Sequence, residues 1–499
     1  MFNPEKMSYS GAQESLLQPE KKKADLKETK EDTKKEIEES KKGSEVEKIK
    51  KFESYLVSLV GAERVNEIKE KAKENLGVSI NSELLLDRYP YKDFVGKSRE
   101  EAKNLLKEKL AYASDSERER LEPFLKKPND KLQAALEENE RKYLEFSRNR
   151  EKALAQFIKS GIKNIRLNPW NSNSWLNWEN VERGKSGEFQ IDPKAEEIID
   201  RLAEAKKNID LVIPFANKNY FGKENRANIP STPEQVEVYT KFCGFLAEHF
   251  KGKINQFEIS SEPNVKPKEL MLGGAFPNNP EAKLYGEVAG RAAEIIKRNN
   301  PQAEIIFGNV ALFDPEFIKN GLAEVKRYEE ELKKEEKLKP HQHLVDYVGF
   351  HPYRRNPEAP SSCIEKGKAQ FTKEQEEAAR KEWGYKSYED QLEIYRRIVN
   401  EYSSQTKLID TEVGWQVGKE GPNRVADEKA QGEYLLKAAA IDASHGISST
   451  FFELFELARG RKYSLLNGKN QPKEGLKNLE GFNEYLEYLK KSIEEKKKM

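Results

Sequence analysis

The chain has 499 residues but only 2 cysteines, 4 methionines and 5 histidines. Cys243 lies in an apolar helical stretch and Cys363 in a loop-like segment, and neither belongs to a pair with metal-site or redox-site spacing. We therefore expect both to be free thiols in a protein that does not depend on disulfides.

Two further features are missing from the sequence: an excess of charge of one sign and a long apolar run. The 88 Lys and Arg residues face 87 Asp and Glu residues, so the net charge is +1 and no overall field attracts nucleic acid or a membrane surface. Nowhere do about 18 apolar residues run together, and the first residues lack an apolar segment of secretory type. These absences predict a soluble, cytoplasmic protein with neither nucleic acid nor membrane as partner.

The start of the chain also lacks apolar residues. Between residues 20 and 51, 22 of 32 residues are charged, with the two signs interleaved. Such a segment cannot bury enough apolar surface to offset its ordering entropy. We expect residues 1–51 to form a charged, disordered tail, and the alternative is a docking arm for a protein partner.

What the sequence does contain is a regular alternation of helical patterns with short apolar runs, which predicts parallel strands buried on both faces. Eight strands are expected, at residues 77–81, 162–167, 209–215, 254–260, 303–308, 344–350, 407–411 and 447–454. Eight such units favour a (β/α)8 TIM barrel, an α/β fold. No turn of the form G-x-G-x-x-G follows the first strand, which argues against a nucleotide-binding sheet.

The remaining segments are placed around this barrel. We predict helices at 52–76 that pack on the barrel, a barrel domain over 77–490, a helical hairpin inserted at about 98–145, and a charged end at 491–499. The break at 124–130, which contains a proline, separates the two helices of the hairpin. Separate barrel helices are expected at 151–160 and 374–402.

In a TIM barrel the reactive groups lie at the carboxyl ends of the strands. Glu262 follows the fourth expected strand and Glu412 ends the seventh, with tryptophans nearby. A pair of carboxylates beside aromatic rings suits hydrolysis of a glycosidic bond, because one protonates the leaving oxygen and the other attacks or stabilises the oxocarbenium-like centre.

Five motifs in order resemble those of the clan A glycoside hydrolases, in particular the cellulase-like and xylosidase/iduronidase-like families. They are GIKNIRLNPW on strand two, EISSEPN on strand four, GFHPY on strand six, LIDTEVGW on strand seven and the ending YSLLNGKNQPKEGLKNL. The resemblance covers about residues 146–485. It implies an enzyme, a retaining O-glycosyl hydrolase that cleaves a β-linked oligo- or polysaccharide by double displacement.

By this resemblance Glu262 is the acid/base and Glu412 the nucleophile. Tyr353 would donate a hydrogen bond to the nucleophile, and Arg166 would keep it ionised, since a nearby positive charge lowers the pKa of a carboxylate. The expected substrate-binding residues are Arg166, Trp170, Ser261, Asn309, His351, Tyr353 and Trp415. No cofactor is expected, and the oligomeric state is left open.

Two departures from the family pattern leave an alternative open. The family usually has Asn before the acid/base, where its amide binds the sugar 2-hydroxyl, and this chain has Ser261. Either Asn264 or Asn309 replaces that contact, or catalysis is weaker. At strand eight the frequent platform Trp is replaced by Phe451 or Phe452. The alternative function is a catalytically impaired barrel that binds carbohydrate or a protein.

Several residues have plain structural explanations beside functional ones. The three tryptophans Trp170, Trp175 and Trp178 either close the barrel top or line a sugar site, and the surrounding Asn and Ser favour the sugar site. Glu453 and Glu456 have no supporting motif and are expected to be supporting or solvent-facing. His341 and His343 lack a carboxylate or cysteine at ligand spacing, so we predict no metal site.

Overall fold

The computed structural model describes most of the chain beyond residue 43. The described residues are 44–72, 78–82, 84, 97–112, 129–169, 174–182, 187–222, 228–265, 280–361, 364–365, 368–369, 377, 380–418, 424–454, 463–467 and 469–498. The chain divides into two units, Met1–Ser58 and Leu59–Met499. In the first unit residues 44–58 are helical, and most of the predicted tail lies outside the described residues.

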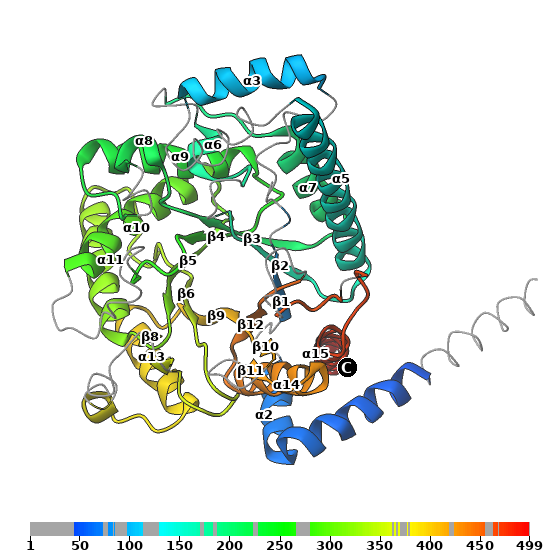
Figure 1. Ribbon diagram of the computed structural model, residues 1–499. Helices are drawn as coiled ribbons and strands as arrows, with labels where there is room; N and C mark the ends of the chain where they lie inside the picture. Colours follow the sequence, from blue (N-terminus) through cyan, green and yellow to red (C-terminus); the bar gives the residue numbers. More distant parts are fainter. Residues whose placement is uncertain are drawn as a thin grey trace, which may run out of the picture. The chain divides into compact units, whose positions relative to one another are not determined.

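The second unit is built around a closed barrel of parallel strands (Figure 1). Neighbouring strands follow the order β1-β12-β9-β6-β5-β4-β3-β2. The strands are β1 (Val78–Ser82), β2 (Asn164–Leu167), β3 (Asn208–Ile213), β4 (Gln256–Ile259), β5 (Glu304–Ala311), β6 (Tyr347–His351), β9 (Lys407–Val413) and β12 (Ser448–Phe451). All eight predicted strands and the TIM-barrel fold are confirmed.

Two small sheets stand apart from the barrel. Strand β7 (Ile364–Glu365) pairs with β8 (Lys368–Ala369) in antiparallel fashion. Strand β10 (Gln416–Val417) pairs with β11 (Arg424–Val425) directly after β9.

Helices surround the strands on the outside of the barrel (Figure 1). They are α2 (Ala62–Lys71), α3 (Arg99–Tyr112), α5 (Asn129–Lys159), α6 (Trp178–Val181), α7 (Pro193–Glu204), α8 (Lys218–Phe221), α9 (Pro233–His249), α10 (Pro280–Asn299), α11 (Pro315–Lys334), α13 (Tyr388–Tyr402), α14 (Glu428–Ser444) and α15 (Glu474–Lys498). None of these helices is long and apolar enough to cross a membrane.

Local sequence explains where the barrel helices begin. Thr232 starts α9 with a capping box to Gln235, and Ser387 starts α13 with a capping box to Asp390. A proline follows the cap of α7, α9 and α11, where its missing N–H leaves no hydrogen bond unmade. The helices therefore start where the strand-to-helix loops require them to.

Two helices differ from the sequence prediction. Helix α5 runs unbroken from Asn129 to Lys159, whereas we expected a hairpin ending near 145 and a separate helix from Glu151. Because this stretch contains no glycine or proline, nothing in it interrupts the helical hydrogen bonds. Helix α13 begins at Tyr388 rather than near 374, since Gly384 has a φ of 71° and Ser387 provides a cap.

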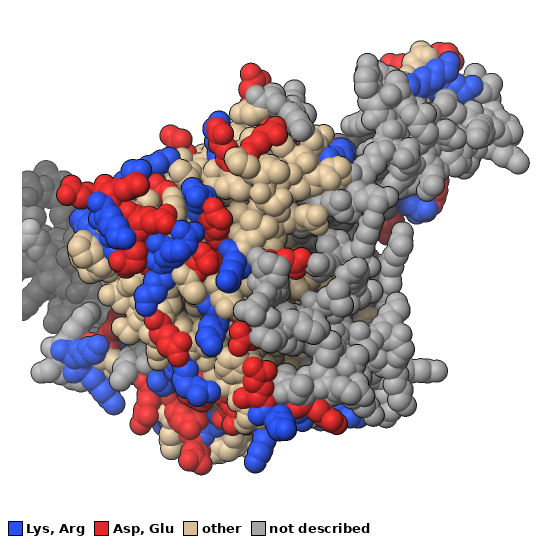
Figure 2. Space-filling model, turned by 90° about the vertical axis from the view of Figure 1, so that its left-hand side faces the viewer, with Lys and Arg blue, Asp and Glu red and all other residues tan. Residues whose placement is uncertain are grey.

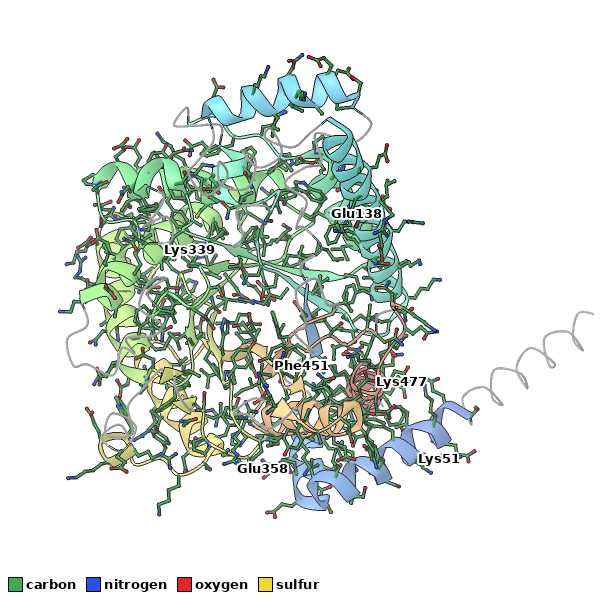
Figure 3. The ribbon with its side chains drawn as sticks, viewed as in Figure 1. Lys51, Glu138, Lys339, Glu358, Phe451 and Lys477 are labelled. Carbon is green, nitrogen blue, oxygen red and sulfur yellow. The ribbon has the colours of Figure 1, made fainter. Side chains whose placement is uncertain are left out.

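The strands are mostly buried, and the outward faces of the helices bear many of the charged side chains. In β3 every residue from Ile209 to Ile213 is buried, as expected for a strand covered on both faces. Figure 3 shows Phe451 of β12 inside the ring of helices, where its side chain is fully buried, while Glu138 and Lys477 project from α5 and α15. The barrel interior is thus reached only through its strand ends.

The outer surface mixes acidic and basic side chains. Figure 2 shows this on the face that carries α10 and α11, where red and blue atoms are interspersed. Pairs one helical turn apart account for part of the pattern, such as Arg291 with Glu287 and Arg327 with Glu331. This face offers no broad patch of one sign, in keeping with the net charge of +1.

Candidate active site

Glu262 is carried by a strained turn at the carboxyl end of β4. Ser260 and Glu262 have φ angles of 63° and 50°, in the left-handed region that costs a non-glycine residue about 1–3 kcal/mol. The Glu262 N–H donates to the Asn309 carbonyl at 2.9 Å, which fixes the turn against the end of β5. The Glu262 side chain keeps 32% of its surface exposed, so it can reach a ligand.

Glu412, the penultimate residue of β9, is held far more tightly. Its Oε1 accepts from the Tyr353 hydroxyl at 2.8 Å, and its Oε2 accepts from Arg166 Nη1 at 2.7 Å. Its own N–H donates to the Asp410 carboxylate at 3.1 Å. Only 13% of the side chain is exposed. Both oxygens of this carboxylate are therefore engaged by protein donors.

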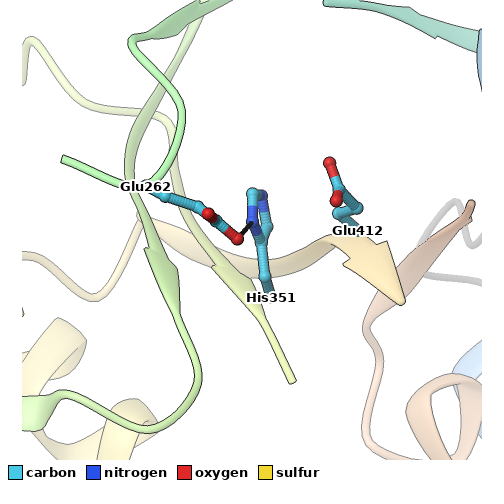
Figure 4. A group of neighbouring side chains, drawn as sticks. All are labelled: Glu262, His351 and Glu412. Atoms are coloured by element: carbon cyan, nitrogen blue, oxygen red, sulfur yellow. Dashed lines mark hydrogen bonds and ion pairs between the residues drawn. The ribbon is translucent and has the colours of Figure 1, made fainter. Parts of the chain in front are cut away.

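The two carboxylates face each other across the barrel mouth together with His351, the last residue of β6 (Figure 4). Ligand atoms of Glu262, His351 and Glu412 all lie within 4.8 Å of one another. Carboxyl groups of retaining glycosidases stand about 5–5.5 Å apart, while those of inverting enzymes stand about 6.5–9.5 Å apart. The 4.8 Å limit on the nearest oxygens of the two glutamates lies below the inverting range.

Arg166 on β2 links the nucleophile position to deeper charges. Its Nε and Nη2 donate to the two oxygens of Glu258 at 2.6 and 2.8 Å, and its side chain has no exposed surface. Burial alone would lower the pKa of Arg166, but the negative charges of Glu258 and Glu412 outweigh it and raise that pKa above its usual range. The guanidinium is a permanent positive charge beside Glu412.

Tyr353 is the second donor to Glu412. Burial, followed by the negative charge of Glu412, raises the pKa of Tyr353 well above its usual range. The phenol therefore stays protonated near neutral pH and keeps its proton to donate to Glu412.

His351 is the only described hydrogen-bonding partner of the Glu262 side chain. Its Nδ1 lies 3.0 Å from Glu262 Oε1, and the ring is fully buried. Its Nε2 makes no hydrogen bond within the described part of the chain.

The same three side chains form a nitrogen and oxygen set of the kind that binds divalent cations. The fit is poor, because Arg166 donates to one Glu412 oxygen at 2.7 Å and Tyr353 donates to the other. A cation would have to displace a buried guanidinium that already carries the positive charge the carboxylate requires. The donor arrangement suits an anionic nucleophile better than a metal ligand.

Neither asparagine suggested as a substitute for the missing amide at position 261 is available. Asn309 donates to the Ser260 carbonyl and accepts from Thr411, and it is fully buried. Asn264 donates to the Ala311 carbonyl and accepts from the Ala311 N–H. Both side chains tie β4 to its neighbours, so the idea that one of them replaces the lost contact is corrected, as is the expected substrate contact of Asn309.

Ser261 itself stays near the reacting groups. Its Oγ accepts from Arg166 Nη2 at 3.3 Å, and the residue is partly exposed. Ser261 is therefore the residue next to the acid/base that can still meet a bound ligand.

Trp415 does not line the site, which corrects the expectation from its motif. Its ring is fully buried, and its N–H donates to the Arg354 carbonyl at 2.8 Å. Tyr434 packs edge-on against it. Trp415 supports the loop after β6, and it cannot stack on a substrate while it is buried there.

Trp175 and Trp178 are also buried. Trp178 stacks on Tyr220 and Phe242 with ring centroids 5.2 and 5.9 Å apart, and Trp175 lies 4.7 Å from the Arg150 guanidinium. Both belong to the packing over the barrel rather than to a sugar-lining surface. Trp170 lies outside the described residues, and its predicted contact stays a prediction.

Partly exposed aromatic rings come instead from the end of β12. Phe451 is fully buried, but Phe452 is partly exposed and packs edge-on against Tyr463 at 5.4 Å. Tyr463 lies 6.5 Å from the ring of Tyr353. Sequence reasoning did not single out Tyr463, although it begins the motif YSLLNGKNQPKEGLKNL, because it lies well after the end of a strand. Glu453 is buried, and Glu456 lies outside the described residues.

Comparisons with known proteins give distant likenesses. No family model matches the chain, and no curated protein matches its sequence. Among solved structures, a family 39 glycoside hydrolase from Bacteroides cellulosilyticus WH2 is 13% identical with a TM-score of 0.45, over 67% of this chain and 60% of that one. This chain therefore spans less than two thirds of that protein.

Two further solved structures resemble the chain at a similar level. Xylanase 10B from Thermotoga maritima is 14% identical with a TM-score of 0.41, over 69% of this chain and 91% of that one. A GH5 family lichenase from Caldicellulosiruptor sp. F32 is 14% identical with a TM-score of 0.43, over 67% and 83%. At these identities the chemistry of this chain has to be argued from its own residues.

Proposed function

We propose that the protein is a retaining glycoside hydrolase that cleaves β-linked sugars by double displacement. The observation that carries the proposal is the pair Glu262 and Glu412, whose oxygens lie within 4.8 Å across the barrel mouth. Their different surroundings support different roles, since Glu412 is 13% exposed and accepts hydrogen bonds from two side chains, whereas Glu262 is 32% exposed and lies beside His351.

In the first step the Glu412 carboxylate attacks the anomeric carbon, and the proton of Glu262 passes to the departing glycosidic oxygen. A covalent glycosyl ester forms on Glu412, and the leaving alcohol takes one proton. As the ester forms, Arg166 and Tyr353 keep the carboxylate oriented.

In the second step Glu262, now ionised, removes a proton from water. That water attacks the anomeric carbon from the face opposite to Glu412. The bond to Glu412 breaks, the carboxylate is released, and Glu262 is protonated again. The product keeps the anomeric configuration of the substrate. His351 remains beside Glu262 in both protonation states.

A mechanism-based 2-fluoroglycoside tests this function. Incubation with a panel of activated 2-fluoro β-glycosides should add one sugar to the intact protein, and peptide mass spectrometry should place it on Glu412. The variant Glu412→Gln is the matched control and should take no label. Label on a different residue, or inverted product with an active β-glycoside, would rule the proposal out.

The second candidate is a barrel that binds carbohydrate without turnover. It is favoured by one observation: Ser261 offers a single hydroxyl already bonded to Arg166, and Asn264 and Asn309 are committed elsewhere. Calorimetric binding of oligosaccharides without hydrolysis by wild type, and without 2-fluoroglycoside labelling, would establish this reading instead. A chelator is expected to leave any hydrolysis unchanged, because neither role needs a metal.

A further inference from the structure

Beneath the two catalytic positions, a second pair of carboxylates is packed against Arg166. Glu258 on β4 accepts two hydrogen bonds from the guanidinium, and Asp210 on β3 is in register with Arg166 on β2. Arg166 and Glu258 have no exposed side-chain surface, and Asp210 is 6% exposed. Both acids lie within strands rather than after them, although Glu258 is the first residue of the motif EISSEPN.

We propose that Glu258 is a positioning residue for the nucleophile. It orients the Arg166 guanidinium toward Glu412 and shares the positive charge of Arg166 with Glu412. Asp210 contributes a neutral acid to the same cluster. The inference rests on the proposed function of Glu412. It adds a role for two residues that do not touch the substrate.

The geometry of the guanidinium supports the aiming role. Glu258 binds the Nε and Nη2 edge through both of its oxygens, so the plane of Arg166 is fixed. Fixing that edge leaves Nη1 to point at Glu412, which it reaches at 2.7 Å. Without Glu258, nothing in the described contacts of Arg166 would hold its plane except the weaker 3.3 Å contact to Ser261.

The charges support the sharing role. Burial would raise the pKa of Glu258, but the charge of Arg166 outweighs it, so the pKa of Glu258 is lowered and the group is ionised. Arg166 therefore divides one positive charge between two carboxylates. The other groups that face Glu258 are Asp210, His351 and the Tyr285 hydroxyl.

Asp210 is the neutral member. Burial, followed by the charge of Glu258, raises the pKa of Asp210 well above its usual range. It hydrogen-bonds to Glu258, and its Oδ1 makes no hydrogen bond in the described part of the chain. A buried ionised carboxylate with an orphaned oxygen would be very costly, so Asp210 carries the proton of its bond to Glu258.

The experiment that tests this inference should measure the reactivity of Glu412 with a reagent that is not a sugar. A small non-sugar epoxide esterifies reactive carboxylates, and peptide mass spectrometry follows the rate at Glu412 as a function of pH. This rate reports how well Glu412 is presented as an ionised nucleophile. If wild type is esterified at Glu412 but hydrolyses no glycoside, the proposed function fails while the inference survives.

The variants separate charge from geometry. Asp210→Asn is expected to behave like wild type, because an amide can replace a neutral acid as donor to Glu258. Adding Glu258→Gln to the Asp210→Asn variant removes the counter-ion of Arg166. Because position 210 is then an asparagine, it cannot ionise in place of Glu258. The double variant should react about 10- to 100-fold more slowly, and the pH of half-maximal rate should fall by about one unit, since Arg166 then faces Glu412 alone.

Glu258→Asp tests the aiming role by itself, and it serves if the double variant does not fold. It keeps the charge but is one methylene shorter, so the rate should fall while the pH of half-maximal rate stays within about 0.3 units of wild type. Wild-type rates in Glu258→Asp and in the double variant would overturn the inference. A large pH shift in Asp210→Asn alone would overturn the neutral role of Asp210.

Glu329→Gln is the matched control. Glu329 on α11 is also fully buried and accepts from the Leu344 N–H at 2.7 Å and from Tyr402, but it contacts none of the residues of the site. Its loss should lower the melting temperature without changing the rate at Glu412 or its pH dependence. If the Glu258 variants show only this pattern, their role is structural and the inference is wrong. An unreactive Glu412 in wild type would also overturn it.

Discussion

The two sides of the barrel mouth hold their glutamates in opposite ways. On the β9 side, Glu412 is 13% exposed and bonded to Arg166 and Tyr353 through side chains. On the β4 side, Glu262 is 32% exposed, and its backbone carries the constraint. One side fixes the charge of a carboxylate, and the other fixes only its position.

The difference follows from what each group has to do. A nucleophile needs one protonation state throughout, and donors such as a guanidinium and a phenol with a raised pKa do not titrate in the working range. An acid/base needs both states, so it is placed by its main chain and left with His351 as a partner. The predictions below test this division of labour, from the largest effect to the smallest.

Replacing Glu412 should have the largest effect. Glu412→Gln removes the nucleophile but keeps its size, so hydrolysis of any β-glycoside should fall by more than about a thousandfold. Circular dichroism should show an intact fold. Activity within roughly tenfold of wild type would remove Glu412 from the mechanism.

Replacing Glu262 should have an effect that depends on the substrate. For a poor leaving group, Glu262→Ala should lose about 10²–10⁴ in rate, the usual contribution of a general acid/base. For an activated aryl glycoside, the first step should survive and azide should restore turnover, giving a β-glycosyl azide from a β-glycoside. An inverted azide product, seen by NMR, would contradict the retaining mechanism.

Removing one donor from the β9 side should have an intermediate effect. Tyr353→Phe deletes the hydroxyl that bonds Glu412, and a hydrogen bond to a charged group contributes about 1.5–3 kcal/mol. We therefore expect a loss of roughly 10- to 100-fold in kcat/KM on every substrate tested, whatever its leaving group. A loss confined to poor leaving groups would instead assign Tyr353 to the acid/base side.

The smallest effect on activity should come from the outer surface of the β9 side. Glu389 at the start of α13 binds Arg64 of α2 and His445 after α14. Of these helices, α13 precedes β9 in the chain and α14 follows it. Hydrogen bonds from His445, and then from Arg64, lower the pKa of Glu389 to about 2 despite its partial burial. Glu389→Gln should leave kcat unchanged.

The stability of that variant should depend on pH in a defined direction. Because the pKa of Glu389 is lower in the folded chain, its stabilisation is fully present above the unfolded value of about 4.5 and is lost as the pH falls toward 2. At pH 7 the variant should be less stable by about 1 kcal/mol after solvent screening. Urea midpoints of the two proteins should converge near pH 2, and a constant difference would contradict the assignment.

Much of this molecule could be read from sequence because its signals are local. Each strand is a short apolar run after a helix, and Glu412, Tyr353 and Arg166 belong to motifs at strand ends, where the fold brings them together. Glu258 was missed although it begins the motif EISSEPN, because it lies inside β4 rather than at its end. Its contact with Arg166 on β2 depends on the registers of β2, β3 and β4 in the closed barrel.

The tryptophans show the other limit. A tryptophan in a polar loop has the same signature whether it lines a ligand site or fills a space under the loop. For Trp178 the outcome depends on Tyr220 and Phe242, which come from separate helices. For Trp415 it depends on Arg354 in the loop after β6. Whether such a tryptophan is exposed depends on which residues pack against it from distant parts of the chain. A single sequence does not show which residues these are.

The left-handed residues at the ends of β4 and β5 also set a limit for protein engineering. Ser260, Glu262, Asn309 and Leu312 all have φ between 47° and 63°. A screen for heat resistance alone would reward glycine at Ser260, because glycine adopts this angle without steric cost. Such a substitution would loosen the turn that carries Glu262. A selection for higher thermal stability of this barrel therefore has to include a selection for turnover.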